Sequence, residues 1–389
     1  MRILMTSCPQ YGHFFPLVPL GWAFQSSGHE VRVAVPQQFA ETVASSGLPA
    51  VTVGGVVRTR DIMGVGDRQL LADWSSDPRG MHVTAIRTVS RFANFLTDPI
   101  VDLCRAWRPD LIVHTALEFA GPIAAQVTGI PAVSINLGPA LPREALRGVD
   151  QELADLYERW GQNPSPGPPA IELDLWPPSL QAAQTGRARA IRHIPYSGPG
   201  AVPAWLLRPA PPPRVCVTLG SVIPQTGGTD ALSAILPALD ELGYDTVVIL
   251  PDQQARAAAD GAYGRVPLNA RVASPGSGPW LPFSYVAPTC DVVIHHGGAG
   301  TTLTCLAGGL PQLILPHMAD QFTVADQLAR QGTARMLQPG TATREGVVAS
   351  LHGLLNDADH RAAAQRLQKE IQQLPSPSET VERLVEVAG

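Results

Sequence analysis

Charge is scarce in this sequence, and lysine is almost missing. Charged residues make up 16% of the 389 residues, and Lys369 is the only lysine. The 28 basic and 33 acidic residues give a formal net charge of −5. A basic face of the kind that binds nucleic acid or an anionic membrane is therefore not expected.

Long apolar runs and cysteine motifs are also lacking. No apolar run reaches the ~18 residues that a membrane-spanning helix needs, and we expect no secretory signal peptide. The five cysteines are scattered, without a CxxC pair or a Cys/His cluster. Neither a zinc site nor a disulfide framework is therefore expected. We expect reduced thiols and a cytoplasmic protein.

Short β-branched runs alternate with longer amphipathic stretches over much of the chain. In the first half, strands are predicted at 2–6, 30–35, 111–113 and 132–136, and helices at 16–27, 37–46 and 120–128. In the second half, strands are predicted at 215–219, 246–250 and 291–295, and helices at 230–242, 301–307 and 321–331. Further helices are predicted within 343–373. Such alternation predicts α/β architecture, with parallel sheets that helices cover on both faces.

The alternation is interrupted between Gly138 and Arg208, where proline, glycine and polar residues dominate. The proline-rich run 208–214 is typical of a semi-rigid linker, and the alternative is a long surface loop within one domain. We therefore predict two doubly wound domains, residues 1–207 and 215–374. A last helix within 375–389 could return to the first domain.

The strongest local signal is the run 292–302, with the sequence VVIHHGGAGTT. A buried strand is predicted to enter a glycine-rich turn, after which a helix begins. Glycines let the backbone approach a ligand closely, and a helix N-terminus offers unpaired N–H groups to an anion. We expect a phosphate site with His296 at its mouth, and a structural role for His295. The alternative is a turn whose glycines serve packing alone.

Two weaker patterns lie at predicted strand ends. His13 follows the first strand, and a histidine at the carboxyl end of a strand is well placed as a general base. A histidine that caps a loop is the alternative. Asp320 and Gln321 follow a later strand end, where such a pair can hold the hydroxyls of a sugar. Alone, Asp320 could equally be a helix N-cap.

Together, these motifs resemble the GT-B glycosyltransferases, specifically the bacterial nucleotide-sugar enzymes that decorate antibiotic and polyketide aglycones. The resemblance covers essentially the whole chain, because the family's motifs occur in the family's order. They are the pair Gly12-His13, the run HHGGAGTT, the segments PPSL at 177–180 and HIPY at 193–196, and Pro311-Gln312 followed by Asp320-Gln321. The resemblance implies two Rossmann-like, doubly wound domains that face each other across a cleft.

The resemblance also assigns roles to residues. It implies that His13 is the catalytic base that deprotonates the acceptor hydroxyl. It implies diphosphate contacts from the 296–301 loop and the loop after the strand at 215–219, nucleobase contacts from 280–282, and sugar contacts from Asp320 and Gln321. The implied nucleotide-sugar site consists of Gly220, Ser221, Trp280, Leu281, His296, Gly297, Gly298, Gly300, Thr301, Asp320 and Gln321.

One position departs from the family pattern. Many relatives place an aspartate after the strand at 111–113, where it orients the catalytic histidine, and here Thr115 stands at that position. Either Glu118 takes that part as a second catalytic residue, or His13 works without a carboxylate partner. A third possibility is that Glu118 only starts the helix at 120–128, where negative charge is favourable.

The implied activity is an inverting transfer of a deoxysugar from a TDP-sugar to a hydrophobic aglycone. An aromatic polyketide is the preferred acceptor, joined through a C–O or a C–C bond. We expect no cofactor and no metal, since N–H groups, Thr301 and His296 can stabilise the leaving diphosphate. The triplet Asp357-Ala358-Asp359 is predicted to be a solvated turn. The only expected partners are small molecules, and a homodimer is compatible with the sequence.

The acceptor side is expected in the first domain. Its candidate lining is loops 53–74 and 141–169 with Phe14, Phe15, Phe92 and Phe95. The alternative for these aromatic residues is a place in the core, where such side chains more often lie. Three other functions were weighed. A sugar-nucleotide epimerase would need a further carboxylate set, and a non-catalytic auxiliary partner of a glycosyltransferase is disfavoured by Gly12-His13. A nicotinamide-dependent oxidoreductase is disfavoured because no GxGxxG follows the first strand.

Overall fold

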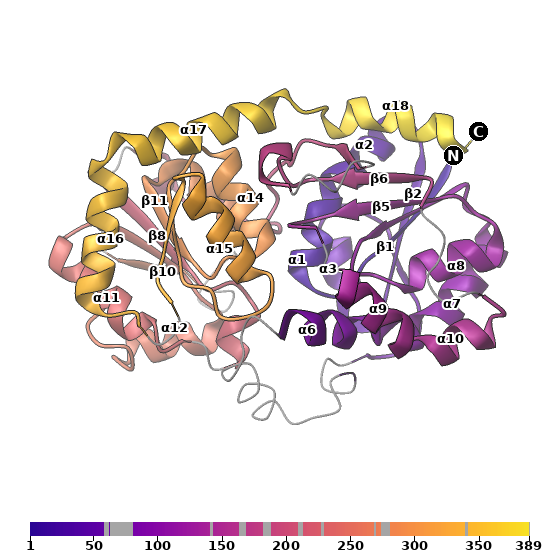
Figure 1. Ribbon diagram of the computed structural model, residues 1–389, viewed down its shortest axis with the longest axis horizontal. Helices are drawn as coiled ribbons and strands as arrows, with labels where there is room; N and C mark the ends of the chain where they lie inside the picture. Colours follow the sequence, from indigo (N-terminus) through magenta and orange to yellow (C-terminus); the bar gives the residue numbers. More distant parts are fainter. Residues whose placement is uncertain are drawn as a thin grey trace. The chain divides into compact units, whose positions relative to one another are not determined.

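Two compact units make up the chain (Figure 1). The computed structural model describes residues 1–57, 62, 81–140, 143–162, 169–181, 188–208, 213–226, 229–267, 270–273, 281–338 and 341–388. The first unit is Met1–His193 with Gln373–Gly389, and the second is Ile194–Gln372. Each unit has its own parallel sheet, so the predicted fold class is confirmed.

The sheet of the first unit has the strand order β3-β2-β1-β4-β5-β6-β7. Its strands are β1 (Arg2–Thr6), β2 (Glu30–Val35), β3 (Ala50–Thr52), β4 (Leu111–Thr115), β5 (Ala132–Asn136), β6 (Ile171–Asp174) and β7 (Arg189–Ala190). Each neighbouring pair is parallel. The direction of strand addition reverses between β1 and β4, and ligands of such sheets bind outside the carboxyl ends of the strands at this point.

Helices cover both faces of this sheet. They are α1 (Tyr11–Phe14), α2 (Val18–Ser26), α3 (Ala40–Ala44), α6 (Met81–Ser90), α7 (Phe92–Trp107), α8 (Ala120–Thr128), α9 (Arg143–Glu152), α10 (Ala154–Arg159) and α18 (Pro377–Ala388). Successive residues of β1 point to opposite faces. Met5 lies against Gly21 of α2, and Thr6 lies against Gly121 of α8. Thus α2 and α8 cover opposite faces, with α18 beside α2 and α7 beside α8.

The sheet of the second unit has the order β10-β9-β8-β11-β12-β13, again parallel, with its reversal between β8 and β11. Its strands are β8 (Arg214–Thr218), β9 (Asp245–Ile249), β10 (Arg271–Ala273), β11 (Val292–His295), β12 (Gln312–Ile314) and β13 (Ala334–Met336). Its helices are α11 (Leu232–Leu242), α12 (Asp252–Ala259), α13 (Phe283–Val286), α14 (Ala299–Ala307), α15 (Gln321–Arg330), α16 (Arg344–Asn356) and α17 (Ala358–Gln373).

Alternation along these strands builds two cores. Val215 and Val217 pack in the cluster that includes residues of α11 and α16, whereas Cys216 packs in a second cluster with Cys305 of α14. Among the described residues, six short 3₁₀ turns lie within the units, at Phe15–Leu17, Gln37–Phe39, Pro178–Leu180, Ala204–Leu207, Ile223–Thr226 and Ala287–Thr289. None of the described helices combines the length and apolar character that a bilayer crossing requires.

The interrupted segment between Gly138 and Arg208 contains regular structure that the sequence analysis did not assign. Helices α9 and α10 and strands β6 and β7 lie there. Strand β6 pairs along β5 and extends the sheet, with Ile171 and Leu173 buried. Short strands between proline-rich stretches carry too few residues to show a period.

The division between the units lies at His193 and Ile194, ahead of the expected linker at 208–214. The residues just before that linker belong to the second unit, because side chains anchor them there. Ser197 Oγ accepts a hydrogen bond from Ser284 N at 2.7 Å. The Trp205 ring lies 4.6 Å from the guanidinium carbon of Arg271, a cation–π contact, and Leu206 is buried in the core. Residues 209–212 lie outside the described residues.

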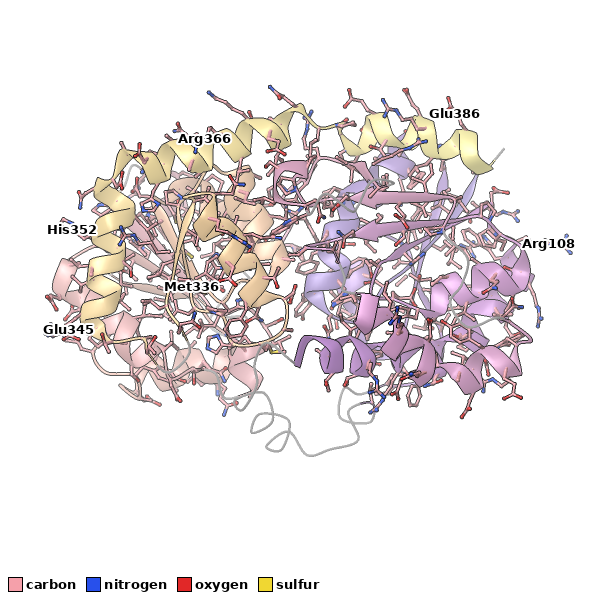
Figure 2. The ribbon with its side chains drawn as sticks, in the orientation of Figure 1. Arg108, Met336, Glu345, His352, Arg366 and Glu386 are labelled. Atoms are coloured by element: carbon pink, nitrogen blue, oxygen red, sulfur yellow. The ribbon has the colours of Figure 1, made fainter. Side chains whose placement is uncertain are left out.

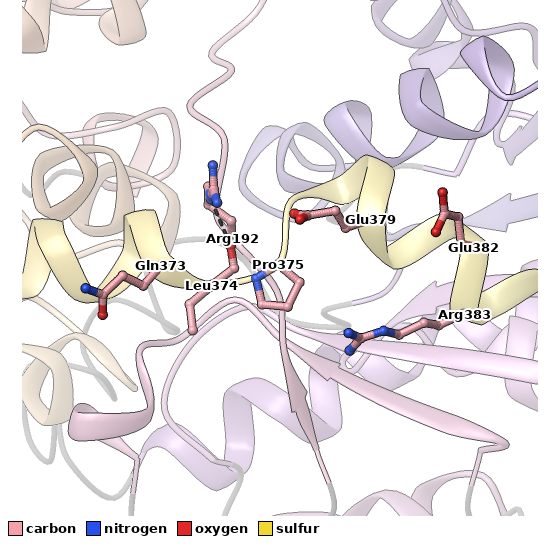
Figure 3. Close-up of a pocket in the computed structure, with 7 residues that line it drawn as sticks. All are labelled: Arg192, Gln373, Leu374, Pro375, Glu379, Glu382 and Arg383. Carbon is pink, nitrogen blue, oxygen red and sulfur yellow. Dashed lines mark hydrogen bonds between the residues drawn. The ribbon is translucent and has the colours of Figure 1, made fainter.

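The C-terminal helix α18 belongs to the first unit, and Arg192 fixes its entry. Arg192 donates from its backbone N to Pro375 O at 2.8 Å and from Nε to Leu374 O at 2.9 Å (Figure 3). Ser376 and Glu379 then form a capping box, in which Ser376 N donates to Glu379 Oε2 at 2.7 Å and Glu379 N to Ser376 Oγ at 3.3 Å. This corner borders a cavity of about 360 Å³ that charged side chains line.

The C-terminal helices keep their charged side chains outside. Glu345 on α16, Arg366 on α17 and Glu386 on α18 are exposed and point away from the ribbon (Figure 2). The triplet at 357–359 lies at the exposed junction of α16 and α17, so it is solvated as predicted, although Ala358 and Asp359 begin helix α17 and do not form a turn.

Replacement of Gly121 by alanine tests the contact between β1 and α8. An added Cβ would lie 2.3 Å from Thr6 Oγ1 and 2.7 Å from Glu118 Oε2. We expect the Gly121→Ala variant to lose about 1–3 kcal/mol of unfolding free energy in urea denaturation, despite the better helix propensity of alanine. Gly55 has no atom within 4 Å of an added Cβ, so Gly55→Ala should stay within about 0.5 kcal/mol. Equal stability of both variants would contradict the packing described.

Candidate functional site

His13 lies in α1, immediately beyond the carboxyl end of β1. The helix is started by Gln10, whose carbonyl accepts from His13 N at 3.1 Å and from Phe14 N at 3.0 Å. Nδ1 of His13 is buried and has no hydrogen-bond partner among the described residues. The His13 side chain as a whole is half-buried. Burial lowers the pKa of His13 to about 4, so the imidazole is neutral and can accept a proton.

Glu118 is buried at the start of α8, on the other side of the sheet. Its Oε1 accepts from Ala120 N at 2.7 Å, and its Oε2 accepts from Gly121 N at 2.9 Å and from Thr6 Oγ1 at 2.5 Å. Burial raises the pKa of Glu118, while these hydrogen bonds act against that rise. No hydrogen bond joins Glu118 to His13. These are the contacts of a residue that starts a helix.

The loops after β8 and β11 meet around the His296 ring. A Cβ on Gly220 would lie 2.5 Å from His296 Cε1, and a Cβ on Gly298 would lie 2.4 Å from His296 Nε2. Gly220 also has a φ of 69°, which favours glycine. The structure therefore brings together two segments that the sequence analysis assigned to one phosphate site. Gly220 and Gly298 leave room for the imidazole of His296 because neither glycine has a side chain.

Helix α14 begins at Ala299, two residues before the predicted start. Gly298 is its N-cap, and Thr302 N donates to Gly298 O at 2.9 Å. The first-turn N–H groups, which include those of Gly300 and Thr301, have no partner within the helix and carry the positive end of its dipole. This arrangement suits an anion.

His295 is structural, as expected. Its Nδ1 accepts from Gly297 N at 3.0 Å, so its Nε2 carries the proton and donates to Gln312 Oε1 at 2.8 Å. These bonds hold the backbone of the glycine-rich loop to β12. The sequence analysis included Gln312 in the Pro311-Gln312 motif without giving it a role, and the structure shows that this fully buried glutamine holds His295.

Gln321 lies against the glycine-rich loop. A Cβ on Gly297 would lie 3.4 Å from Gln321 Cβ. Gln321 Oε1 accepts from His317 N at 2.8 Å and Met318 N at 3.2 Å, so this oxygen shapes the preceding loop. Asp320 occupies the N-cap position of α15 without a capping hydrogen bond from its side chain. Ala319 has a φ of 54°, a strained value of the kind found at ligand-binding loops.

The remaining residues expected to contact the nucleotide or the acceptor differ in their exposure to solvent. Ser221 is half-buried beside Gly220, whereas Leu281 is 8% exposed and packs in the core of the second unit. Trp280 lies outside the described residues. On the acceptor side, Phe14 and Phe92 are buried core residues, so the expectation that they line a site is wrong.

Of the four expected phenylalanines, Phe15 and Phe95 remain as candidate acceptor contacts. Phe15 is half-buried and stacks on Tyr11 with ring centroids 5.2 Å apart, and Tyr11 is 40% exposed. Phe95 is exposed on α7. The expected lining loops lie partly outside the described residues, since 58–61, 63–80, 141–142 and 163–168 are not described.

His296, in the glycine-rich loop of the second unit, is a neutral histidine. Burial, with the neighbouring His295 and His317, lowers the pKa of His296 to about 3. Within the described part of the chain, no group of three or more histidine, cysteine or acidic side chains could hold a metal ion.

Two glycine variants separate the fold of this loop from its use by a ligand. Gly298→Ala should displace His296 and lower both thermal stability and affinity for thymidine diphosphate, because the added Cβ collides with the ring. A Cβ added at Gly300 meets no atom within 4 Å, so the Gly300→Ala variant should keep its melting temperature. Its affinity for the nucleotide should fall, because the added methyl group blocks the approach of the nucleotide to the backbone. Calorimetry of binding and of unfolding measures both. A Gly300→Ala variant with unchanged affinity would contradict the assignment of Gly300.

Buried histidines should make the protein sensitive to acid. Burial lowers the pKa of five histidines. The value is about 4 for His13, His114, His193 and His295, and about 3 for His296. The unfolded chain therefore binds more protons below pH ~6.5, and the unfolding free energy should fall from there toward pH 4. Asp174, whose pKa is raised to about 6, and Glu118, whose pKa burial also raises, act in the opposite sense but are two groups against five histidines. Urea unfolding at several pH values measures the slope, and a flat profile would contradict it.

Known proteins were compared with this chain. Residues 22–220 match the family described as Erythromycin biosynthesis protein CIII-like, N-terminal domain, and residues 233–387 match the corresponding C-terminal domain. The chain is 34% identical over 391 residues to L-demethylnoviosyl transferase of Streptomyces niveus, which covers 99% of this chain and 97% of that protein.

Two further similarities extend over the whole chain. Aclacinomycin-T 2-deoxy-L-fucose transferase of Streptomyces galilaeus is 31% identical over 428 residues, covering 98% of this chain and 94% of its own. The structure of spinosyn rhamnosyltransferase SpnG complexed with thymidine diphosphate has a TM-score of 0.82 and 28% identity, covering 99% of this chain and 100% of that chain. This chain therefore belongs to the erythromycin biosynthesis protein CIII-like family and is a GT-B glycosyltransferase of the antibiotic- and polyketide-tailoring kind.

Proposed function

We propose that this glycosyltransferase moves a deoxysugar from a TDP-sugar to a hydrophobic aglycone, with inversion and without a metal ion. One observation carries the proposal: each sheet has an imidazole beyond the strand ends at its topological reversal. His13 follows β1 next to β4, and His296 follows β11 next to β8. These are the points at which sheets of this type bind ligands.

The second unit would hold the donor. Thymidine diphosphate in the SpnG complex and the deoxysugar in the name of the Streptomyces galilaeus relative support a TDP-linked deoxysugar as the donor. The loop around His296 and the N-terminus of α14 would receive the diphosphate, and Asp320 with the free Nε2 of Gln321 would contact the sugar. These roles agree with the anion-binding character of the loop.

The reaction would be a single displacement. Nε2 of His13 takes the proton of the acceptor hydroxyl while the acceptor oxygen bonds to the anomeric carbon. The bond from that carbon to the diphosphate oxygen breaks, and the diphosphate leaves with the electron pair. Attack opposite the leaving group inverts the anomeric centre. The N–H groups of α14, Thr301 and His296 would stabilise the charge that develops on the leaving oxygens.

For the acceptor, we propose an aromatic polyketide. The stacked rings of Tyr11 and Phe15, close to His13 in the chain, favour a planar apolar molecule. A phenolate formed at His13 shares its charge with the ortho carbon, so a C–C bond is chemically available as well as a C–O bond.

Replacement of His13 tests the proposed base. We expect His13→Ala to lower kcat by about 10²–10⁴-fold, because general base catalysis is lost, while thymidine diphosphate binds as before. His352→Ala on the exposed face of α16 is the matched control and should behave as the wild type. A His13→Ala variant with near-normal turnover would overturn the mechanism.

The same assay separates the alternatives. Release of thymidine diphosphate is measured with and without aglycone and with and without a chelator, and the sugar product is identified. Transfer that requires the aglycone and survives the chelator supports the proposal. An epimerised sugar formed without aglycone would indicate an epimerase, and no turnover without a second protein would indicate an auxiliary partner.

A further inference from the structure

Three separate stretches of the first unit are tied together by one carboxylate and two guanidinium groups. Glu152, at the end of α9, accepts from Arg91 Nε at 2.6 Å through Oε1 and from Arg87 Nη2 at 3.1 Å through Oε2. Arg91, which follows α6, also donates from Nη1 to Ile62 O at 3.3 Å. We call these four residues, Ile62, Arg87, Arg91 and Glu152, the Arg91 clamp.

The Arg91 clamp lies at the carboxyl edge of the first sheet. Helix α7 ends the crossover from β3 to the parallel strand β4, so it runs back from that edge, and Arg91 at its start lies there. Ile62 follows β3 and Glu152 follows β5, and both meet Arg91. The clamp therefore belongs to the edge at which sheets of this type bind ligands.

The clamp joins segments from both sides of the topological reversal. In the sheet order, β2, β1 and β4 lie between β3 and β5, so these two strands are roughly 19 Å apart at the usual strand spacing. His13 follows β1, one of the strands between them. Hydrogen bonds through Arg91 thus connect a segment that leaves one side of the His13 strand with a segment that leaves the other side.

The clamped helices also pack against each other. Helices α6 and α9 lie side by side (Figure 1). A Cβ added at Gly148 of α9 would lie 2.8 Å from Arg87 Cδ, so the stem of Arg87 lies directly on α9. Apolar residues of the connected stretches share one buried cluster, which includes Ile62, Ile86, Val149 and Leu153. The clamp therefore closes a packed assembly at this edge.

Two large apolar side chains next to the clamp are left open to solvent. Leu146 on α9 is 40% exposed, and Phe95 on the first turn of α7 is 45% exposed. An apolar molecule that binds at this edge would meet such side chains. Their positions depend on how α9 is held against α6 and the start of α7, which is the contact that the clamp makes.

Charge gives the clamp its geometry. The hydrogen bond from Arg91 lowers the pKa of Glu152, which therefore stays a carboxylate near neutral pH. The Glu152 side chain is 17% exposed, whereas those of Arg91 and Arg87 are 35% and 44% exposed. Hydrogen bonds between charged groups fix orientation strongly, but dissolved salt screens such partly exposed pairs. The clamp should therefore weaken as the salt concentration rises.

We propose that the Arg91 clamp positions the acceptor-binding edge of the first unit, and that Glu152 thereby sets the affinity for the aglycone without taking part in the chemistry. This inference rests on the function proposed above, which places the aglycone in this unit. Glu152 is a positioning residue, because it acts through Arg87 and Arg91 on the helices that present apolar side chains. An uncharged aglycone makes no ion pair itself, so salt acts on its binding through the clamp.

Replacement of Glu152 by glutamine tests the clamp with a saturating TDP-deoxysugar and an uncharged anthraquinone aglycone. We expect Glu152→Gln to raise the aglycone KM by ~10-fold, because a neutral side chain no longer holds two guanidinium groups. The kcat at saturating aglycone and the affinity for thymidine diphosphate, measured by calorimetry, should stay as in the wild type. Asp102→Asn is the matched control, since it removes an exposed ion pair with Arg105 within α7.

Two further measurements distinguish the clamp from a general effect on the fold. The double variant Arg91→Gln with Glu152→Gln should have the same aglycone KM as Glu152→Gln alone, because both changes remove one contact. A rise in salt from ~0.05 to ~0.5 M should raise the aglycone KM of the wild type and leave that of Glu152→Gln unchanged. Arg87→Ala, at an exposed member of the clamp, should raise this KM by a smaller factor and serves if Glu152→Gln fails to fold.

Each outcome bears on one of the two proposals. An aglycone KM in Glu152→Gln and Arg87→Ala equal to that of the wild type would overturn the inference. So would a parallel loss of thymidine diphosphate affinity and kcat, since the clamp would then only support the fold. If the wild type released no thymidine diphosphate with any aglycone, the proposed function itself would be overturned.

Discussion

Parallel pairing of every strand with its neighbours is the constraint on which both sites depend. Since all strands of a sheet run in one direction, the loops that follow them collect at a single edge. Reversal of the strand order then places two such loops side by side without a helix between them. In the first unit these loops follow β1 and β4, and in the second they follow β8 and β11. Residues far apart in sequence, such as Gly220 and His296, meet for this reason.

Incomplete hydrogen bonding marks the same edge in both units. His13 Nδ1 and Thr115 Oγ1 lie there in the first unit, and His296 Nδ1 lies there in the second, all buried and without partners among the described residues. His295, one residue earlier in the chain, has partners on both ring nitrogens. This contrast separates a histidine that holds the loop from one that remains able to bind. A fold tolerates such groups only where the surrounding structure is strong enough to hold them.

Much of the fold follows from local signals in the sequence. Helix Ala120–Thr128 and strand Ala132–Asn136 have the predicted bounds, because Gly129 ends the helix with a φ of 71° and a short turn leads into the strand. Strands β6 and β7 were missed, since proline-rich stretches surround them. The two units divide at residues 193 and 194, before the expected linker at 208–214, because Trp205 and Leu206 are attached to the second unit through contacts with distant residues.

The motifs of the site could be predicted from the sequence. The hydrogen-bond partners of their side-chain atoms could not. The family resemblance named His13, and Glu118 was considered as a substitute for the family's aspartate. Only the structure shows that the carboxylate of Glu118 meets Thr6, which is 112 residues away. Phe14 and Phe92 could not be recognised as core residues from spacing alone. Conversely, the glycines at 220 and 298 were assigned to one phosphate site, and the structure adds the physical reason, which is the space that one imidazole needs.

Positions 115 and 118 are three residues apart in the chain but lie on different sides of the first sheet. Thr115 is the last residue of the strand and faces the helices that follow β1, whereas Glu118 lies beyond the strand and turns to α8 on the opposite face. A carboxylate at position 118 therefore lies on the opposite face of the sheet from a side chain at position 115. At position 118, the carboxylate stabilises a helix terminus and joins it to β1.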